Sequence, residues 1–263
     1  MLSSRVLVAA QVCNPSHLPV KHSSKQLGRS LALKFSAAYP TVFLLARSSE
    51  SYDAIVKEIK ASGRNAVGIS TDVSSASSVS SALKVIAAET ANKNLAAAVY
   101  NVGGKFVRKP FLELTEEEYS AGFEASGRGF FNFAHGILPL LLETAALSQA
   151  IPNPPSLLVT GATASLKGSA QCASFASGKF ALRATTQSLA REFGPKGVHV
   201  AHAIIDGAID TPKLKESGWK VNGGEEDGAI APDAIADAYY WLHTQPRSAW
   251  SQEIDIRPFI EKW

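Results

Sequence analysis

The chain contains only two cysteines and one methionine among its 263 residues. Cys13 and Cys172 are too few for a disulfide framework and lack the spacing of metal ligands, so the sequence favours a reducing compartment and predicts no metal site. The apolar stretch from Val6 to Cys13 is short and includes Gln11, which suits a buried first strand better than a secretory signal. We therefore expect a cytoplasmic protein.

Long apolar runs and dense basic clusters are also missing. No run approaches the length that spans a bilayer, so we expect no membrane partner. The 26 Lys and Arg against 23 Asp and Glu give a formal charge of +3 without a cluster that could follow a phosphate backbone, so nucleic acid is not an expected partner. Apolar residues make up 46% of the chain, and no low-complexity stretch divides it. We expect one domain over residues 1–263.

Short apolar runs alternate with amphipathic helical patterns. The runs predict strands over residues 5–10, 41–46, 66–70, 95–100, 157–160, 198–205 and 253–256. The amphipathic segments predict helices over 28–38, 52–61, 76–90, 115–142, 175–193 and 231–243. Thr115 and Glu118 form a capping-box signal for the fourth helix, and Pro139 is placed to kink or shorten its end. This alternation predicts a doubly wound Rossmann-type α/β fold with a parallel sheet of about seven strands, whose ligand site lies beyond the strands' carboxyl ends.

Small and polar residues follow the predicted strands in a definite order. They are Asp72-Val73 after the third strand, Asn101-Val102-Gly103-Gly104 after the fourth, Thr160 to Ser165 after the fifth, Phe175 and Lys179 in the next helix, and Asp206-Gly207 with Thr211 after the sixth strand. Over essentially the whole chain, this order and spacing resemble the short-chain dehydrogenase/reductase superfamily. The stretch from Thr160 to Pro212 resembles an atypical microbial branch, of fungal type, that carries Phe in place of the usual Tyr. The resemblance implies an oxidoreductase that uses a nicotinamide cofactor on a small-molecule substrate.

The residues around the second strand indicate which nicotinamide cofactor is used. Arg47 ends that strand, where its charge and its fork of donors suit the 2′-phosphate of NADP(H), and Ser48 adds a hydroxyl. By resemblance, Lys25 occupies a position at which NADP-using relatives carry a basic residue. The alternative for Arg47 and Lys25 is that both are solvated surface charges.

The remaining cofactor contacts are implied by the resemblance. Asp72, next to Val73, would accept from the adenine amino group, and the backbone at Asn101 and Gly103 would run beside the adenosine ribose. Lys179 would bind the nicotinamide ribose, and Thr211 would contact the carboxamide. The structural alternatives are a helix cap for Asp72, a turn for Asn101 and a solvated ammonium for Lys179.

The phosphate-binding turn departs from the family pattern. The resemblance places His22 and Gln26 where the first two glycines of the turn belong, and only the third, Gly28, is retained. A side chain where φ must be positive costs about 1–2 kcal/mol, and a Cβ can keep the backbone away from phosphate. Extra sequence from Cys13 to Val20 leads us to expect an irregular stretch over residues 12–27. It is either a remodelled loop or a segment foreign to the fold, translated from an unspliced intron.

The reaction centre is also altered. The family uses Asn, Ser, Tyr and Lys, and the resemblance maps these positions onto Ser126, Ala162, Phe175 and Lys179. A Tyr and a Lys at i and i+4 share one face of a helix, where the ammonium lowers the phenol pKa enough for proton exchange. Phe175 keeps the ring but has no proton to give.

Other groups are available to stabilise charge in place of the phenol. Thr163 and Ser165 are near enough to supply a hydroxyl from a shifted loop, and Arg128 is an unusual charge in a run of small and apolar residues. Hydride transfer itself needs only orientation, so an activated acceptor such as an iminium or a conjugated carbonyl is the least demanding substrate. The leading hypothesis is an NADP(H)-dependent reductase of an activated carbonyl or imine with a non-standard proton donor. The alternatives are a cofactor-free binding module and a non-redox cyclase or isomerase in which Arg128 polarises a carbonyl.

Two further expectations concern assembly and access. Small residues over 121–136 and 175–190 resemble the faces with which relatives form a four-helix interface, which implies a homodimer or homotetramer. The segment over about residues 206–230, which contains Trp219, falls where the family has a mobile substrate lid.

Overall fold

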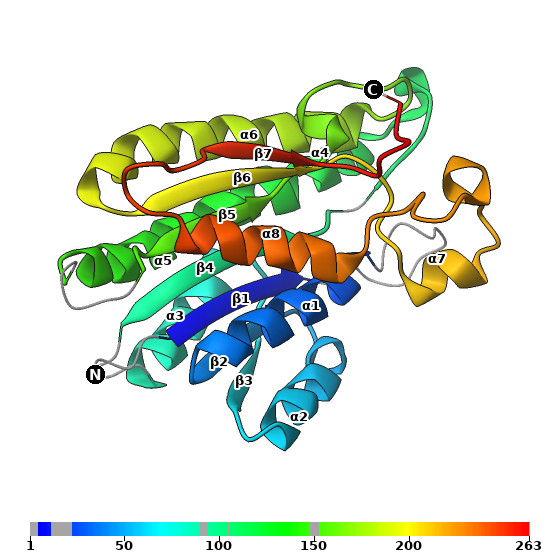
Figure 1. The fold of residues 1–263 in the computed structure, drawn as a ribbon. Helices are drawn as coiled ribbons and strands as arrows, with labels where there is room; N and C mark the ends of the chain where they lie inside the picture. Colours follow the sequence, from blue (N-terminus) through cyan, green and yellow to red (C-terminus); the bar gives the residue numbers. More distant parts are fainter. Residues whose placement is uncertain (1–4, 12–22, 90–93, 105, 148–152, 263) are drawn as a thin grey trace.

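The structure is a computed structural model that describes residues 5–11, 23–89, 94–104, 106–147 and 153–262. Its centre is a seven-stranded parallel sheet with the strand order β3-β2-β1-β4-β5-β6-β7 (Figure 1). The strands are β1 (Arg5–Gln11), β2 (Thr41–Ala46), β3 (Asn65–Ser70), β4 (Leu95–Val102), β5 (Ser156–Thr160), β6 (His199–Ile205) and β7 (Glu253–Ile256). The chain winds outward from β1 to β3 and then returns to place β4 on the other side of β1. The predicted doubly wound α/β fold is therefore confirmed.

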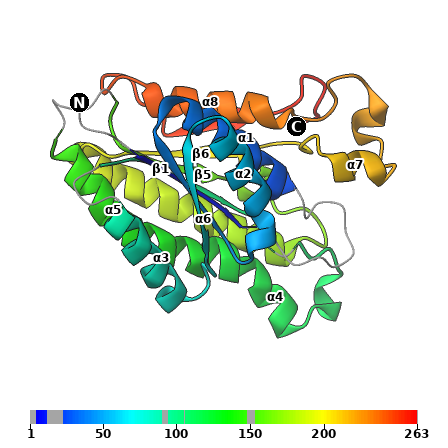
Figure 2. The same cartoon turned by 90° about the horizontal axis from the view of Figure 1, so that it is seen from below.

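Helices cover both faces of the sheet. They are α1 (Ser23–Ala38), α2 (Asp53–Ala61), α3 (Ala76–Glu89), α4 (Glu116–Phe123), α5 (Phe130–Ala145), α6 (Ala173–Phe193), α7 (Pro212–Glu216) and α8 (Pro232–Thr244). Figure 2 shows α1, α2 and α8 on one side of the sheet and α3, α5 and α6 on the other. Each side has its own buried apolar cluster. All six residues of β2 are buried, because its alternate side chains enter the two clusters.

The first helix begins earlier than predicted. We expected it to begin at Gly28, but α1 begins at Ser23, so Lys25 and Gln26 are helical rather than part of an irregular loop. Leu27 is fully buried and packs in the core cluster of the α1 side, which stabilises these first turns. Gln26 does not have the positive φ that the glycine pattern implied. His22 and the stretch from Cys13 to Val20 lie outside the described residues.

The predicted long helix over residues 115–142 is divided and extended. Thr115 and Glu118 form the predicted capping box at its start, which is confirmed. A π-helical turn over Glu124–Gly129 then separates α4 from α5. Pro139 lies inside α5, which continues to Ala145 instead of ending near the proline. Pro139 has no N–H and removes one backbone hydrogen bond from the helix. Burial of Leu141 and Ala145 on the core face nevertheless favours continuation of the helix beyond it.

Two glycines bring α4 and α6 into backbone contact. A Cβ at Gly178 would lie 2.3 Å from the carbonyl oxygen of Gly122, and a Cβ at Gly122 would lie 2.1 Å from the carbonyl oxygen of Ser174. The Ser174 hydroxyl also donates to the carbonyl of Glu118, 2.7 Å away. Part of the small-residue pattern therefore serves packing within the chain.

Gly178→Ala is expected to destabilise the protein by about 1–3 kcal/mol, because the new methyl group has no room and must push two helix backbones apart. Gly194→Ala is the matched control, since a Cβ there meets no atom within 4 Å. Urea unfolding of both variants measures the difference. Equal stability of the two variants would contradict the tight α4 and α6 contact.

Candidate active site

A pocket with a volume of about 430 Å³ opens at the carboxyl ends of β4, β5 and β6. This is the edge at which a doubly wound sheet is expected to bind its ligand. Of the predicted site residues, the pocket brings together Asn101, Gly103, Thr163, Phe175, Lys179 and Thr211. Asn101 is buried near the end of β4, and Thr211 is buried in the segment after β6, where its hydroxyl accepts from the Leu214 amide at 3.1 Å.

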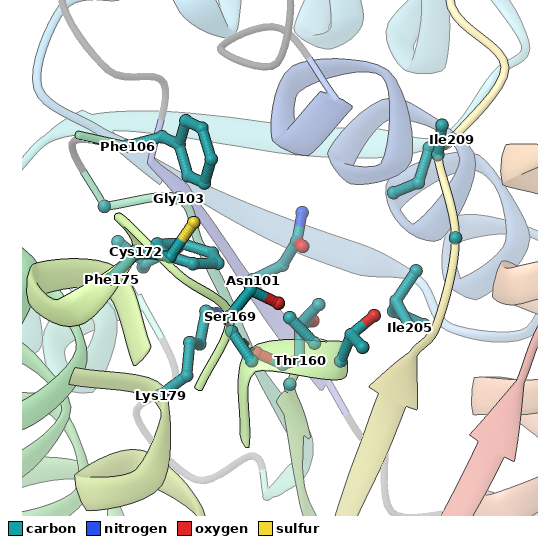
Figure 3. Close-up of a pocket in the computed structure, with 18 of the residues that line it drawn as sticks. Asn101, Gly103, Phe106, Thr160, Ser169, Cys172, Phe175, Lys179, Ile205 and Ile209 are labelled. Carbon is teal, nitrogen blue, oxygen red and sulfur yellow. Dashed lines mark hydrogen bonds between the residues drawn. The ribbon is translucent and has the colours of Figure 1, made fainter. Parts of the chain in front are cut away.

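The two sides of this pocket carry different apolar groups. Figure 3 shows the rings of Phe106 and Phe175 and the thiol of Cys172 on one side, and Ile205 and Ile209 on the other. The two rings meet edge to face, with centroids 5.2 Å apart and planes inclined by 77°. This geometry is favourable for an aromatic pair. The walls therefore suit the apolar part of a small organic ligand.

Lys179 supplies a buried positive charge to the pocket. Its side chain extends from α6, is only 4% exposed, and donates from Nζ to the carbonyl oxygen of Thr160 at 3.1 Å. Burial lowers the pKa of Lys179 from 10.5 to about 8, because water no longer solvates the ammonium. Nζ lies 5.9 Å from the ring centroid of Phe175, within the range of a cation–π contact. The ammonium and the aromatic ring thus share one wall, as the i and i+4 spacing predicted.

A polar cluster behind Lys179 anchors α6 to the sheet. Arg183, one helical turn further along α6, makes two hydrogen bonds of 2.7 Å to Glu253 on β7. Glu253 also bonds to Nδ1 of His202 on β6 at 2.9 Å. Burial lowers the pKa of His202, so this imidazole is neutral at physiological pH. These bonds fix the helix that carries both Phe175 and Lys179.

The hydroxyl groups after β5 point in different directions. The short helical turn Thr163–Ser165 positions them. Ser165 is fully buried and donates to the carbonyl oxygen of Ala162 at 2.6 Å, so it does not line the pocket. Thr163 does line the pocket, and its hydroxyl donates to Oδ1 of Asp206 at the end of β6. Of the two hydroxyls predicted here, the structure brings only Thr163 to the site.

The predicted residues of the π-helical turn lie behind or outside the pocket. Ser126 is buried and is not part of the lining. It lies behind Gly104, which does line the pocket: a Cβ placed on Gly104 would be 4.0 Å from the Ser126 Oγ. Arg128 lies on the protein surface, where its side chain is 60% exposed and pairs with Glu124 at 3.4 Å. Its guanidinium therefore does not face the pocket. The turn itself is held by a 2.6 Å hydrogen bond from Tyr100 to the carbonyl of Ala125.

Basic side chains gather around the loop that follows β2. Lys25, in the first turn of α1, donates to the carbonyl oxygen of Glu50 at 3.2 Å. Arg47 and Ser48 are exposed at the start of the same loop, and the Ser48 hydroxyl lies 3.4 Å from that of Ser51. The structure thus brings Lys25, from a different element, to the loop that carries Arg47. Gly28 is buried further along α1.

The residues after β3 have structural partners. Oδ1 of Asp72 accepts from the amide of Ser74 at 3.0 Å and from its hydroxyl at 2.7 Å. Val73 is buried in the apolar cluster of the α5 side, and its carbonyl oxygen accepts from Asn132 at 2.9 Å. The half-buried Asp72 therefore orders the turn before α3. The structural alternative for this residue was a helix cap, but the hydroxyl that accepts from the first turn of α3 is that of Ser75, 3.3 Å from the Ser78 amide.

Several residues that line or support the pocket were not predicted as site residues. Phe106 and Cys172 lie in irregular segments, and a pattern of strand ends does not point to them. Leu214 and Trp219 also line the pocket, from the segment predicted as a lid. The sequence identified Asp206 only as a residue at the end of a strand. Its contact with Thr163 could not be predicted, because the two residues are 43 positions apart in the sequence.

The described residues form neither a membrane-spanning helix nor a cluster of metal ligands. Within the described ranges, no helix combines the length and the apolar character needed to cross a membrane. The same ranges contain no gathering of three or more His, Cys, Asp or Glu side chains that could hold a metal ion.

Known proteins share this sequence pattern and architecture. A sequence profile described as short chain dehydrogenase matches residues 22–221. A short-chain dehydrogenase from Rhodopseudomonas palustris is 31% identical, with a TM-score of 0.74 and coverage of 97% of this chain and 99% of that one. An uncharacterized oxidoreductase of Listeria innocua is 24% identical over 92% of this chain and 95% of its own length. A metagenomic short-chain oxidoreductase in complex with NADP is 18% identical, with a TM-score of 0.74 and coverage of 99% of both chains.

Proposed function

The chain belongs to the short-chain dehydrogenase family, and on that premise we propose that it is an NADP(H)-dependent reductase of an activated carbonyl or imine. The observation that carries this proposal is the ammonium of Lys179, buried in the wall of an otherwise largely apolar pocket. Burying a charge is unfavourable unless a partner compensates for it. Among the described residues, the Lys179 ammonium makes one hydrogen bond, to Thr160, which leaves two of its three hydrogens for a ligand.

The residues around the pocket fit NADP(H). Lys179 and Thr211 would hold the nicotinamide half, because they offer an ammonium and a hydroxyl group in the lining of the pocket, and the backbone at Asn101 would run beside the adenosine ribose. The first turn of α1 and Lys25 would face the pyrophosphate, which helix amides favour. Arg47 would pair with the 2′-phosphate. Bound NADPH supplies a hydride, and the complex of the metagenomic relative with NADP supports this choice of cofactor.

Phe175 is central to the proposed substrate class. We place the chain in a branch with Phe175 and Ala162 where relatives carry Tyr and Ser, so that no phenol gives a proton to a substrate oxygen. Loss of a general acid slows a reaction typically by about 10²–10⁴-fold. An activated carbonyl or an imine depends less on such a donor, which is why these acceptors are favoured. The surface ion pair of Arg128 with Glu124 gives no support to a cyclase or isomerase that depends on this arginine.

Arg47→Gln is expected to weaken NADPH binding by about 10- to 100-fold, because a charge-assisted hydrogen bond to phosphate contributes about 1.5–3 kcal/mol. Binding of NADH, which has no 2′-phosphate, should change by less than about threefold. Fluorescence titration with both nucleotides measures the two effects. Arg64→Gln, an exposed arginine at the start of β3, is the control.

The outcomes of this titration separate two claims. If the wild-type protein binds no NADPH at millimolar concentration, the reductase proposal is wrong. If Arg47→Gln weakens NADPH and NADH equally, the protein binds nicotinamide nucleotides but Arg47 does not recognise the phosphate.

We also propose that the protein assembles through α4 and α6. Three aromatic side chains on α4 and α6 are exposed by more than 40%: Tyr119, Phe123 and Phe180. They support a homodimer or homotetramer formed through these helices.

A further inference from the structure

A buried carboxylate backs the one hydroxyl that the turn after β5 presents to the pocket. The Thr163 hydroxyl donates to Oδ1 of Asp206, which is only 5% exposed. On the other side, Oδ2 of Asp206 lies 3.6 Å from Nη2 of Arg257. Arg257 also pairs with Asp255 on β7. A chain of polar groups therefore runs from the pocket wall through Asp206 toward the edge of the sheet.

This carboxylate is unusual for its position. Asp206 directly follows β6, between Ile205 and Gly207, both of which line the pocket. A carboxylate is rarely buried at this level unless charge or hydrogen-bond partners compensate. Packing alone does not require an acid here, because an apolar residue would fill the same volume without a desolvation cost. The partners that compensate for it here are Thr163 and Arg257, so the acid connects a hydroxyl of the pocket wall to a largely buried guanidinium.

We propose that Thr163 is the proton-transfer residue of this site and that Asp206 is the positioning residue that holds and exchanges its proton. This inference rests on the proposed reductase function, and it names the donor that Phe175 does not provide. Ser165 is not an alternative, because its hydroxyl is turned to the Ala162 carbonyl. Thr163 is therefore the hydroxyl of this turn that can meet a substrate oxygen.

The proton balance of the step follows from this geometry. In reduction, the carbonyl carbon gains a hydride from the reduced nicotinamide, and the C=O π bond breaks. The Thr163 proton would move to the substrate oxygen, and Thr163 would regain a proton that Asp206 has taken up from solvent, so that Asp206 ends the step as the carboxylate that accepts from Thr163. In alcohol oxidation, the alcohol proton moves to Thr163 while the Thr163 proton returns to the Asp206 carboxylate.

The surroundings of Asp206 hold its carboxylate beside Thr163. The charged groups that the described structure brings to Asp206 are Arg257 and, beyond it, Asp255. A carboxylate in this position can receive the hydroxyl proton of Thr163 along the hydrogen bond that already joins them.

The decisive test uses two substrates that differ in their need for a proton. Isatin is a neutral activated ketone, whose reduction needs a hydride and a proton. An N-methyl dihydroisoquinolinium salt is a preformed iminium, whose reduction needs a hydride alone. Thr163→Val and Asp206→Asn should each slow isatin reduction by about 10²–10⁴-fold and leave iminium reduction within about threefold of the wild type. Thr163→Ser, which keeps a hydroxyl, should retain most of the isatin activity.

Matched controls distinguish a chemical role from a structural one. Asp255→Asn removes a charge beside the same guanidinium without touching Thr163, and it should leave both activities unchanged. NADPH affinity and thermal stability are measured for every variant.

Each outcome has one meaning. Equal losses with isatin and the iminium, or unchanged isatin reduction by Asp206→Asn, overturn the assignment and leave only a structural role for Asp206. A wild-type protein that binds no NADPH, or that reduces neither compound, contradicts the reductase proposal itself.

Discussion

Lys179→Met is expected to raise the free energy of unfolding at pH 7 by about 2 kcal/mol and to weaken NADPH binding by about 10-fold or more. The gain in stability arises because burial lowers the pKa of Lys179 from 10.5 to about 8. At about 1.4 kcal/mol for each factor of ten, the buried charge costs the native state about 3 kcal/mol. Loss of the hydrogen bond to the Thr160 carbonyl offsets about 1 kcal/mol of this gain.

The pH dependence of this effect has a definite sign. Between about pH 8 and pH 10.5, the unfolded chain keeps a proton on Lys179 that the native protein has released. Wild-type stability should therefore rise with pH over this range, and the variant should lack this contribution. The advantage of Lys179→Met is full below about pH 8 and disappears as the pH approaches 10.5.

Urea unfolding of the two proteins at several pH values measures this difference. Lys57→Met, at an exposed position of α2, is the control and should change neither stability nor NADPH affinity. A less stable Lys179→Met protein at pH 7 would show that the ammonium stabilises the fold, and the main support for a ligand at this position would be lost. A stable variant that has lost NADPH affinity instead identifies a residue retained for binding at the expense of stability.

Most elements of the fold could be predicted from the sequence, because local patterns and tertiary packing favour the same structure. The strand predicted over residues 41–46 has the bounds of β2, since Pro40 precedes its β-branched first residue and the charged Arg47 follows its apolar run. The capping box of Thr115 and Glu118 marks the start of α4 for a similarly local reason. The predicted start of α1 at Gly28 was wrong because it followed the glycine pattern of the family and not the helical periodicity of the apolar residues. Leu27, Leu31 and Phe35 already had the spacing of a buried helix face.

Only some residues of the candidate site could be predicted from the sequence. Strand ends converge at one edge of a parallel sheet, and this rule brought Asn101 and Thr211 to the pocket. The same rule cannot show where a side chain on a helix or a turn points. Arg128 is four residues after Glu124, a spacing that favours a surface ion pair, and this signal was overlooked. The contact between Thr163 and Asp206 is tertiary and has no local signature.

Phe175→Tyr is expected to accelerate isatin reduction by about 10²-fold or more, and to leave reduction of the iminium nearly unchanged. The ring of Phe175 lines the pocket, and its centroid lies 5.9 Å from Nζ of Lys179. A phenol at this position would be an acid whose pKa the nearby ammonium lowers. Phe106→Tyr adds a phenol to the neighbouring ring, away from this helical pair, and should have little effect.

Combining Phe175→Tyr with Asp206→Asn makes the prediction stricter. If the phenol and the Thr163–Asp206 pair supply the same proton, the phenol should restore most of the isatin activity that Asp206→Asn removes. NADPH consumption by both single variants and by the double variant measures this coupling, with NADPH affinity as the check on folding. A phenol that neither accelerates the wild type nor rescues Asp206→Asn would mean that proton supply does not limit this reaction. The presence of Phe at position 175 would then have to be explained by the shape of the pocket. The remaining contribution of Phe175 would be the packing of its ring against Phe106.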